Sequence, residues 1–370
     1  MVYTTFWLRD MPKSSIDQYG LIQGKDLYKL TPKVTFTDVL LTPRISAISS
    51  RSATDIAVQF GPFDLKIPLI SAPMDTITGE TMIRKLAELG AIGTLPRGDL
   101  QERYKICEKL SKDNVPCVYA VGVKERDTDA VTVAKELKKR GAQAVLLDIA
   151  HGGMLSVLEV ARKIKKETGL FLLCGNIADA EQAKEYASKK WGIDAVRVGV
   201  GPGGLCSTRV QTGIGYPQLA AISETSVILK KAGIQVIADG GIREPGDVVK
   251  ALAAGADIVM IGSFFAGTEE TPGEIINGKK MARGQASKAY MKDNGIMTGE
   301  HRTAEGVAVE VIARGSVMHS VYDITGGLRS AMSYIGAKSL KELQTRARFV
   351  QVSPATRFES IPHLSVKSIA

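Results

Sequence analysis

Eight short apolar stretches recur along the chain at nearly constant spacing, and this repeat restricts the possible folds more than any other feature. They begin at residues 66, 91, 116, 143, 170, 194, 234 and 257, so the successive intervals are 25, 25, 27, 27, 24, 40 and 23 residues. Their length and their Val, Ile and Leu content are typical of buried parallel strands. All but one of the intervals have the length of a single βαβ unit. The stretches are KIPLIS (66–71), AIGTL (91–95), PCVYAVGV (116–123), QAVLLDIA (143–150), LFLLCG (170–175), DAVRVGV (194–200), IQVIADG (234–240) and DIVMIGS (257–263).

Amphipathic helical patterns fill the intervals, as in GETMIRKLAELG at 79–90 and PGDVVKALAAGA at 245–256. Eight alternating strands and helices predict an α/β fold, a closed (β/α)8 TIM barrel, with a doubly wound open sheet as the alternative. The 370 residues have room for two domains, but single barrels also reach this length. We therefore expect a single-domain barrel over 31–345, an N-terminal extension over 1–30 and a C-terminal arm over 346–370.

The net charge of +9 would suit an anionic partner, but many lysines fall at predicted helix ends. KELKKRG, KIKKETG, SKKWG and LKKAG each place cations in a last helical turn before a glycine, where they complement the helix dipole. No arginine-rich stripe or aromatic platform accompanies them, so we expect no nucleic-acid partner. No apolar run is long enough to span a membrane, and the first residues lack a charged end followed by an apolar core. We therefore expect a cytoplasmic protein without a membrane partner.

The four cysteines, Cys107, Cys117, Cys174 and Cys206, show neither the spacing of a zinc site nor the density of a disulfide framework. The first three lie in apolar or helical sequence and are expected to pack in the core. Cys206 differs, because it lies in the glycine-rich segment GPGGLCSTRVQTGIG at 201–215, within the one long interval after the sixth strand. In a barrel, such an insertion lies at the carboxyl ends of the strands, where the chemistry of the fold takes place.

The segment around Cys206 could cradle a phosphate, hold a metal or present a nucleophile. Thr208 and Arg209 lie beside the cysteine among the glycines, which favours an exposed thiol with a lowered pKa. We therefore expect Cys206 to be a covalent nucleophile rather than an inert, packed cysteine. Other side chains that follow strands are Ser71, Asp75, Asp148, His151 and Asn176.

Phosphate binding is expected at two other strand ends. The segment 239–242 (DGGI) follows the seventh strand, and Gly262 with Ser263 follows the eighth, which is the usual phosphate position in these barrels. Glycines let backbone N–H groups approach phosphate oxygens, and the next helix adds the positive end of its dipole. Tight turns alone are the alternative interpretation. Asp239 would repel a phosphate, so we expect it to accept hydrogen bonds from ribose hydroxyls.

A second long segment follows the last strand. Residues 273–315 are polar and rich in glycine, which is typical of a mobile flap over an active site rather than of a separate domain.

Six segments of the chain resemble the IMP dehydrogenase and GMP reductase family. They are LLTPR (40–44), SAPMDT (71–76), GPGGLCSTR (201–209), ADGGIREPGDVVKALAAGAD (238–257), GSFFAGTEETPGE (262–274) and GGLRSAMSYIGA (326–337). The resemblance spans about residues 30–343. It implies a (β/α)8 barrel, usually assembled as a homotetramer. It also implies attack by the loop cysteine on C2 of a purine nucleotide, followed by hydride chemistry with a nicotinamide cofactor.

Within the family, the flap most resembles that of GMP reductases. Dehydrogenases activate water with an Arg-Tyr pair in the flap, and no Arg-Tyr dipeptide occurs between 273 and 315. EHRTAEG (300–306) resembles the reductases' EYRAAEG, and TGIGYPQ (212–218) resembles their loop ending. The span 91–122 leaves no room for the paired regulatory insertion of many dehydrogenases. We therefore expect an NADPH-dependent GMP reductase that forms IMP and ammonia.

Other features favour the alternative, an IMP dehydrogenase without a regulatory domain that oxidises IMP to XMP with NAD. AHGG (150–153) and the stretch 237–274 look more like dehydrogenases, and His301 replaces the reductases' usual tyrosine. These positions lie in binding or packing regions, whereas the flap and the Cys206 loop carry the step that distinguishes the two reactions. The flap therefore has more weight in the prediction.

The resemblance also implies roles for individual residues. Cys206 would be the nucleophile, with Thr208 and Glu305 assisting the loss of ammonia, for which Glu305 would need a raised pKa. The residues that would hold the nucleotide are Ser71, Gly204, Asp239, Gly240, Gly241, Gly262, Ser263, Arg283, Gly284, Gln285, Arg302 and Gly306. Those near the NADPH cofactor would be Asp148, Asn176, His301 and Arg302. Backbone carbonyls of Gly201, Gly203 and Cys206 would bind a potassium ion.

Overall fold

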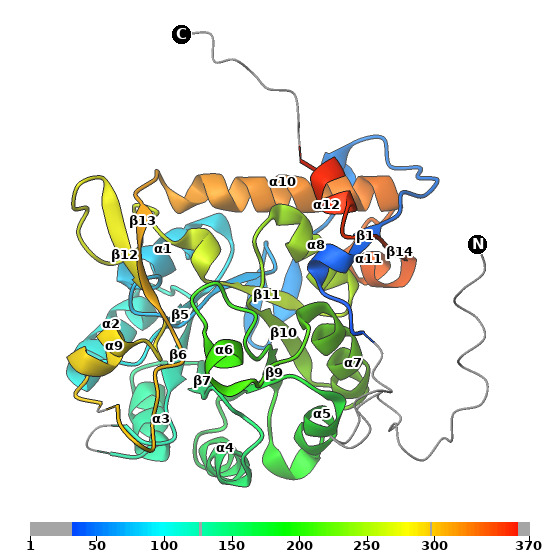
Figure 1. Cartoon of the computed structure of the whole chain (residues 1–370). Helices are drawn as coiled ribbons and strands as arrows, with labels where there is room; N and C mark the ends of the chain where they lie inside the picture. Colours follow the sequence, from blue (N-terminus) through cyan, green and yellow to red (C-terminus); the bar gives the residue numbers. More distant parts are fainter. Residues whose placement is uncertain (1–31, 126–127, 297, 362–370) are drawn as a thin grey trace.

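The computed structural model describes residues 32–125, 128–296 and 298–361 (Figure 1). The predicted N-terminal extension, 1–30, and the last nine residues of the predicted arm lie outside the described residues. The division of the chain at residues 31 and 345 therefore stays a prediction.

Eight parallel strands form one sheet in the order β4-β11-β10-β9-β8-β7-β6-β5. The ring is completed between the edge strands, where Ser71 N donates to Ile92 O at 3.1 Å and Ile92 N donates to Leu69 O at 3.2 Å. The prediction of a (β/α)8 barrel is confirmed, and the alternative of an open sheet is wrong. The strands are β4 (Leu69–Ser71), β5 (Gly93–Leu95), β6 (Cys117–Val121), β7 (Ala144–Asp148), β8 (Phe171–Ile177), β9 (Ala195–Val198), β10 (Gln235–Asp239) and β11 (Ile258–Ile261).

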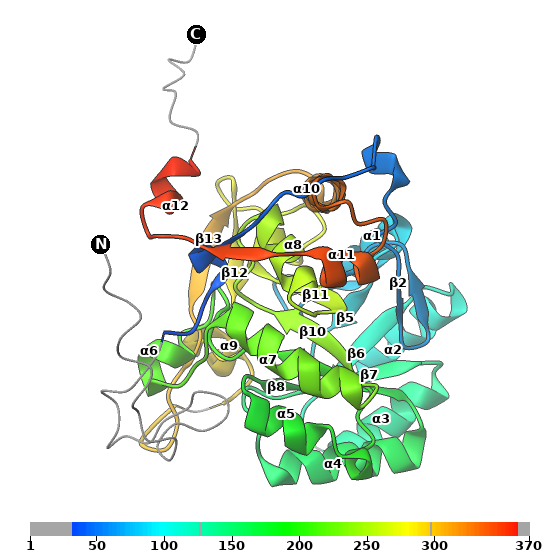
Figure 2. The same cartoon turned by 90° about the vertical axis from the view of Figure 1, so that its right-hand side faces the viewer.

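Helices surround the sheet, as Figures 1 and 2 show from two sides. The helices that follow the eight strands in turn are α1 (Glu80–Leu89), α2 (Leu100–Lys112), α3 (Ala130–Lys139), α4 (Leu155–Thr168), α5 (Ala180–Tyr186), α7 (Gln218–Lys231), α8 (Pro245–Ala253) and α10 (Val317–Ile335). Asp99, Asp129 and Asp179 begin α2, α3 and α5 by accepting hydrogen bonds from N–H groups of the first turn. Three of the four lysine-glycine patterns end α-helices as predicted, at α3, α4 and α7, and α4 stops at Gly169 in a left-handed conformation. The fourth pattern, SKKWG, instead forms a 3-10 helix after the end of α5.

Apolar side chains fill the interior of the barrel and close its amino end. Inward-pointing residues such as Ile70, Leu146 and Ile237 pack together with no exposed surface. The hairpin of β2 (Val58–Phe60) and β3 (Phe63–Leu65) contributes Phe60, whose ring meets Phe171 edge-on at 5.4 Å. The hairpin covers this end of the barrel interior, and the chemistry of such barrels takes place at the opposite, carboxyl end of the strands.

Shorter elements complete the structure. β1 (Val39–Leu41) pairs in antiparallel fashion with β14 (Phe349–Gln351), which ties the beginning of the predicted arm to the barrel. β12 (Lys279–Arg283) and β13 (Ala308–Ile312) form an antiparallel hairpin that carries the predicted flap. The remaining elements are η2 (Phe36–Asp38), η3 (Arg51–Ala53), η4 (Lys189–Trp191), α6 (Thr208–Thr212), η5 (Ser263–Phe265), α9 (Lys288–Asp293), α11 (Leu340–Arg346) and α12 (Thr356–Glu359). Among the described residues, no helix has the length and apolarity needed to cross a membrane.

Candidate active site

A cavity of about 340 Å³ lies at the carboxyl end of the barrel, between the strand ends and the flap. This volume is in the usual range for small-molecule sites. Sixteen of the twenty residues expected at the site line the cavity. They are Asn176, Gly201, Gly203, Gly204, Cys206, Thr208, Asp239, Gly240, Gly241, Gly262, Ser263, Gly284, Gln285, Arg302, Glu305 and Gly306.

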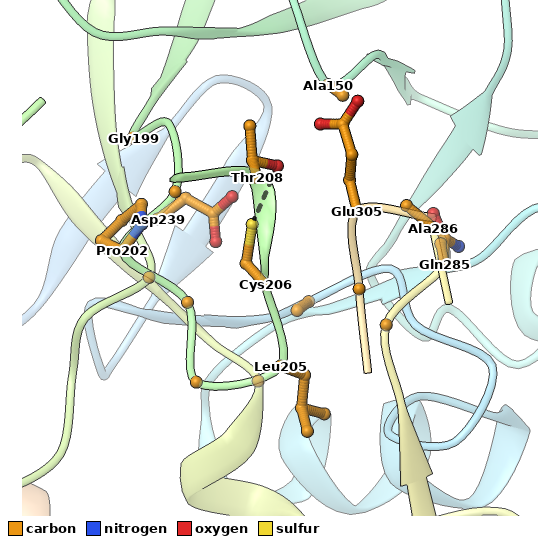
Figure 3. Close-up of a pocket in the computed structure, with 18 of the residues that line it drawn as sticks. Ala150, Gly199, Pro202, Leu205, Cys206, Thr208, Asp239, Gln285, Ala286 and Glu305 are labelled. Carbon is orange, nitrogen blue, oxygen red and sulfur yellow. Dashed lines mark hydrogen bonds between the residues drawn. The ribbon is translucent and has the colours of Figure 1, made fainter. Parts of the chain in front are cut away.

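Cys206 is presented to the cavity by a tight turn at the start of α6. Its N–H donates to Gly203 O at 3.0 Å, and its Sγ atom lies 3.2 Å from Thr208 Oγ1 (Figure 3). Cys206 is exposed, whereas the other three cysteines are buried. Burial raises the pKa of Cys117 to about 12 and that of Cys174 to about 11, which keeps these thiols protonated and inert. The prediction that three cysteines pack in the core is confirmed.

The flap pairs directly with the Cys206 loop. Ser207 N donates to Glu305 O at 2.8 Å, and Val307 N donates to Leu205 O at 3.0 Å. A β-bridge between Cys206 and Gly306 joins the two segments at the same point. This pairing brings the backbone of Glu305, about a hundred residues later in the chain, next to the Cys206 loop. In Figure 3 the carboxylates of Glu305 and Asp239 lie on opposite sides of the Cys206–Thr208 pair.

The glycine pair after β10 lies against the Cys206 loop. Gly240 and Gly241 both adopt left-handed backbone conformations, with φ of 87° and 81°. A Cβ atom on Gly240 would lie 3.0 Å from Pro202 and 3.1 Å from Gly203 N, so glycine is needed for this close approach. On the other side of the turn, Gly204 packs against Ser263, the residue that follows β11. The two predicted phosphate segments and the Cys206 loop therefore form one wall of the cavity.

The helix after this turn is capped by its own carboxylates. Asp247 Oδ2 accepts hydrogen bonds from Arg243 N at 3.0 Å and Glu244 N at 3.3 Å, and Glu244 completes a capping box at the start of α8. The carboxylates of Asp247 and Glu244 therefore already lie at the positive end of the dipole of α8. Of the two features expected to suit a phosphate here, this leaves the N–H groups of the glycines.

Arg197 does not line the cavity but contacts Asn176, Asp239 and Met260, which do, and it was not expected at the site. It comes from β9 and is 6% exposed. Its guanidinium hydrogen-bonds Asp148 and Asn176 and lies 3.6 Å from Asp239 Oδ2. Burial lowers the pKa of Arg197, but the charges of Asp148 and Asp239 outweigh this effect and raise it. One feature of the sequence could have pointed to Arg197, because it is an arginine inside the otherwise apolar strand segment DAVRVGV (194–200).

Asp239 is held by the same cluster. Asn176 Nδ2 donates to its Oδ2 atom at 2.8 Å. Burial raises the pKa of the Asp239 carboxyl above its usual value, while the charge of Arg197 and the hydrogen bond from Asn176 oppose this rise.

Four of the expected site residues do not line the cavity. Ser71 is buried and accepts a hydrogen bond from Thr78 Oγ1 at 2.8 Å. Asp148 is buried against Arg197, and His301 is exposed. Arg283 forms ion pairs with Asp75 and Asp293.

Apolar side chains that sequence reasoning missed line much of the rest of the cavity. They include three methionines from three separate segments, Met74, Met260 and Met291. Nothing in their local sequence distinguishes them from core methionines. The other missed residues are Ala72, Ala150, Gly199 and Ala286, whereas Pro202, Leu205 and Ile242 belong to the expected segments 201–215 and 239–242, and Thr303 belongs to the expected run 302–306.

The described residues include no group of three or more His, Cys, Asp or Glu side chains that could hold a metal ion. The potassium site predicted at the carbonyls of Gly201, Gly203 and Cys206 uses backbone oxygens and stays a prediction.

Known proteins resemble this chain over most of its length. Residues 33–363 match the IMP dehydrogenase / GMP reductase domain. The chain is 35% identical to the GMP reductase of Caenorhabditis elegans over 347 residues, covering 90% of this chain and 95% of the relative. It is 35% identical to a GMP reductase of Escherichia coli (strain SMS-3-5 / SECEC), with 86% and 95% covered. It is also 33% identical to the inosine-5'-monophosphate dehydrogenase of Cryptosporidium parvum, with 89% and 94% covered.

These matches agree with the barrel. The reductase and the dehydrogenase relatives are similar to the chain to nearly the same degree, so identity does not separate the two activities. Because the family match extends over most of the sequence, this chain belongs to the IMP dehydrogenase / GMP reductase family of oxidoreductases, which act on purine nucleotides with a nicotinamide cofactor.

Proposed function

We propose that the chain is a GMP reductase, which converts GMP to IMP and ammonia with NADPH as the hydride donor. The pairing of flap and loop carries this proposal, because it brings the Glu305 segment onto the Cys206–Thr208 turn. A flap that delivers a carboxyl group, and that contains no Arg-Tyr dipeptide between 273 and 315, suits the loss of an amine better than the activation of water.

In the first step, the thiolate of Cys206 attacks C2 of the GMP base and forms a C–S bond. The exocyclic amine leaves from C2 and takes up a proton, so that ammonia is released. Thr208 is placed to pass on that proton because its hydroxyl lies 3.2 Å from Cys206 Sγ, and Glu305 acts with it as the general acid. The product of this step is a purine nucleotide bonded through C2 to Cys206.

The nucleotide would lie along the wall made by the Cys206 loop and the glycine turns. Gly241, Gly262 and Ser263 would face the phosphate, and Asp239 would accept hydrogen bonds from the ribose hydroxyls. Met74, Met260 and Met291 supply soft apolar contacts of the kind that suit a flat base. The flap residues Gly284, Gln285, Arg302 and Gly306 would close over the nucleotide.

The strand ends beside Asn176 fit a cofactor that carries phosphates. Arg97, which follows β5, has a buried Nε atom without a hydrogen-bond partner among the described residues, 3.7 Å from Asp148 Oδ2. Arg97 thus forms an ion pair with Asp148, but its Nε atom makes no hydrogen bond among the described residues, and a cationic donor in this state suits an anionic ligand. Arg97 and Asn176 would hold NADPH here, and the cofactor would supply the hydride that C2 takes up as the C–S bond breaks, so that Cys206 is regenerated and IMP is released. The net reaction is GMP + NADPH + H⁺ → IMP + NADP⁺ + NH₃.

We also propose a homotetramer in the cytoplasm and a potassium ion at the carbonyls of Gly201, Gly203 and Cys206. The family resemblance alone supports the tetramer and the potassium ion.

The second candidate is an IMP dehydrogenase that oxidises IMP to XMP with NAD. It is favoured by the match to dehydrogenase relatives at nearly the same identity and coverage as the reductases. The AHGG segment at 150–153 resembles those enzymes as well.

Product analysis with both nucleotides and both cofactors separates the two candidates. The purified protein is expected to oxidise NADPH in the presence of GMP, with IMP and ammonia formed in equal amounts. If the protein does not consume GMP but converts IMP to XMP while reducing NAD, it is the dehydrogenase and the proposal is wrong.

A further inference from the structure

The guanidinium of Arg197 connects side chains from three neighbouring strands next to the cavity. Asp148 is at the end of β7, Asn176 on β8 and Asp239 at the end of β10, and all three meet Arg197 of β9. Its remaining nitrogen, Nη1, lies 3.9 Å from Met260 Sδ. A buried cation is stable here because carboxylates on two sides compensate its charge.

The local backbone makes room for this side chain. A Cβ atom on Gly175 would lie 2.5 Å from Arg197 O and 2.8 Å from Arg197 Cβ. Only glycine at 175 allows β8 and β9 to approach this closely, and Asn176 follows it directly in the chain. The arrangement therefore fixes Arg197 and Asn176 relative to each other.

Asp239 depends on this cluster for its charge and direction. Arg197 from β9 and Asn176 from β8 favour the carboxylate form, while burial and the nearby charge of Asp148 from β7 oppose it. On the cavity side, Asp239 faces the Cys206–Thr208 pair (Figure 3). Without the cation, a carboxyl group in this position would take up a proton more readily and lose part of its strength as an acceptor.

We propose that Arg197 is a positioning residue for nucleotide recognition, which keeps Asp239 ionised and aimed at the ribose hydroxyls, directly and through Asn176. This inference rests on the proposed function, because it takes the ligand of Asp239 to be the ribose of a purine nucleotide. It does not depend on the direction of the hydride transfer, since GMP and IMP carry the same ribose.

The test measures dissociation constants of GMP and IMP for the full chain and for Arg197→Met and Arg197→Lys. Arg197→Met is expected to raise the dissociation constants of both nucleotides about tenfold or more at pH 7, because a hydrogen bond to a charged acceptor is impaired. The loss is expected to grow as the pH falls, because Asp239 takes up a proton more readily once the cation is removed. Arg197→Lys keeps the cation and is expected to remove this pH dependence while restoring only part of the affinity.

A 2′,3′-dideoxy analogue of GMP distinguishes positioning from a general structural effect. The parent protein is expected to bind GMP at least about tenfold more tightly than the analogue, and this preference is expected to shrink to about threefold or less in Arg197→Met. A variant that has merely lost rigidity would lose affinity for GMP and for the analogue to the same extent. Arg103→Met is the matched control, because Arg103 is also buried but contacts Ala120 O and Glu125, outside the cavity.

Three results would overturn the inference. One is an Arg197→Met protein that keeps the parent's preference for GMP over the analogue. Another, should Arg197→Met fail to fold, is an Arg197→Lys protein with unchanged affinity for both nucleotides. The third is a parent protein that binds neither GMP nor IMP, which also removes the proposed function. If the nucleotides bind but GMP is not reduced, only the proposed reductase activity fails.

Discussion

The Sγ atom of Cys206 lies 3.2 Å from the Oγ1 atom of Thr208, two residues further along the same turn. This spacing places a thiol and a hydroxyl group on one short segment, with the flap paired against it at Glu305 and Gly306. In the reaction that we propose, this segment would hold the attacking atom and the flap would bring the acid, so the proposed chemistry needs the two segments to be paired.

Cys206 is expected to be the one cysteine that reacts in the native protein. The thiols of Cys107, Cys117 and Cys174 are buried, and burial raises the pKa of each, to about 12 for Cys117 and about 11 for Cys174. The thiolate fraction falls about tenfold for each pH unit below the pKa. Iodoacetamide at pH 8 should therefore modify a single site, identified by peptide mass spectrometry, and GMP should protect it.

Two outcomes would contradict this prediction. The first is comparable labelling of Cys117 in the folded protein at pH 8. The second is the absence of protection by GMP. Cys206→Ser serves as the control and should abolish the fast labelling and the turnover while nucleotide binding remains within about threefold of the parent.

Replacing Glu305 should stop the release of ammonia with little effect on binding. Glu305→Gln keeps the size of the side chain but removes the proton that the leaving amine needs. Loss of a general acid lowers the rate by about 100-fold to 10,000-fold. Ammonia release and NADPH oxidation, followed together, should fall by this amount, while the dissociation constant of GMP stays within about threefold.

Glu300→Gln is the matched control for this experiment. Glu300 is an exposed carboxylate of the same flap and does not line the cavity, so its substitution should leave turnover unchanged. If the two variants lose activity to the same extent, flap charge rather than proton transfer explains the effect.

The barrel and the strand-end side of the cavity were predictable from local sequence, whereas the flap residues of the cavity were placed by the family resemblance. Strands and helices alternate at a fixed period, and cap residues such as Asp99 and Gly169 mark the helix ends. The barrel then places every strand end on one side, which is why Asn176, Asp239 and Ser263 line one cavity. These positions follow from the fold alone.

Partners joined across the barrel were not predictable in this way. The pairing of Arg197 with Asp148, and that of Arg283 with Asp75, joins residues 49 and 208 positions apart. No local pattern encodes such contacts, because they depend on the register of several strands at once. The family resemblance places Arg283 at the nucleotide, whereas its described contacts are with carboxylates.

Gly199→Ala should damage both stability and nucleotide binding. Gly199 has φ of 145°, and a Cβ atom there would lie 2.1 Å from Asp239 O and 2.9 Å from the Gln218 side chain. The collision would push Asp239 away from Arg197. We expect the free energy of unfolding, measured in urea, to fall by about 2–4 kcal/mol, and the KM for GMP to rise.

Gly246→Ala is the control for this substitution. A Cβ atom on Gly246 meets no other atom within 4 Å, and the residue lies in the first turn of α8. This change should be neutral or should stabilise the protein by about 0.5–1 kcal/mol. If Gly199→Ala were equally harmless, the close approach between β9 and β10 would not be as tight as described.

The role of Arg283 can be decided by comparing it with Asp293, its partner on α9. Arg283 Nη2 lies 2.5 Å from Asp75 Oδ2 and Nη1 lies 2.5 Å from Asp293 Oδ2, so the side chain links the strand end at Asp75 to the flap. Its hydrogen bonds to Asp75 and Asp293 raise the pKa of Arg283, which keeps it charged at any ordinary pH.

If Arg283 holds the flap in place through these ion pairs, Asp293→Asn and Arg283→Met should both increase hydrogen exchange over 284–296 and lower kcat. Nucleotide affinity should change by less than about threefold. The alternative outcome is that Arg283→Met raises the dissociation constant of GMP tenfold or more while Asp293→Asn leaves it unchanged. In that case Arg283 must leave the carboxylates and bind the nucleotide, as the family resemblance implies. The paired variants therefore separate a residue that holds the flap from one that holds the substrate.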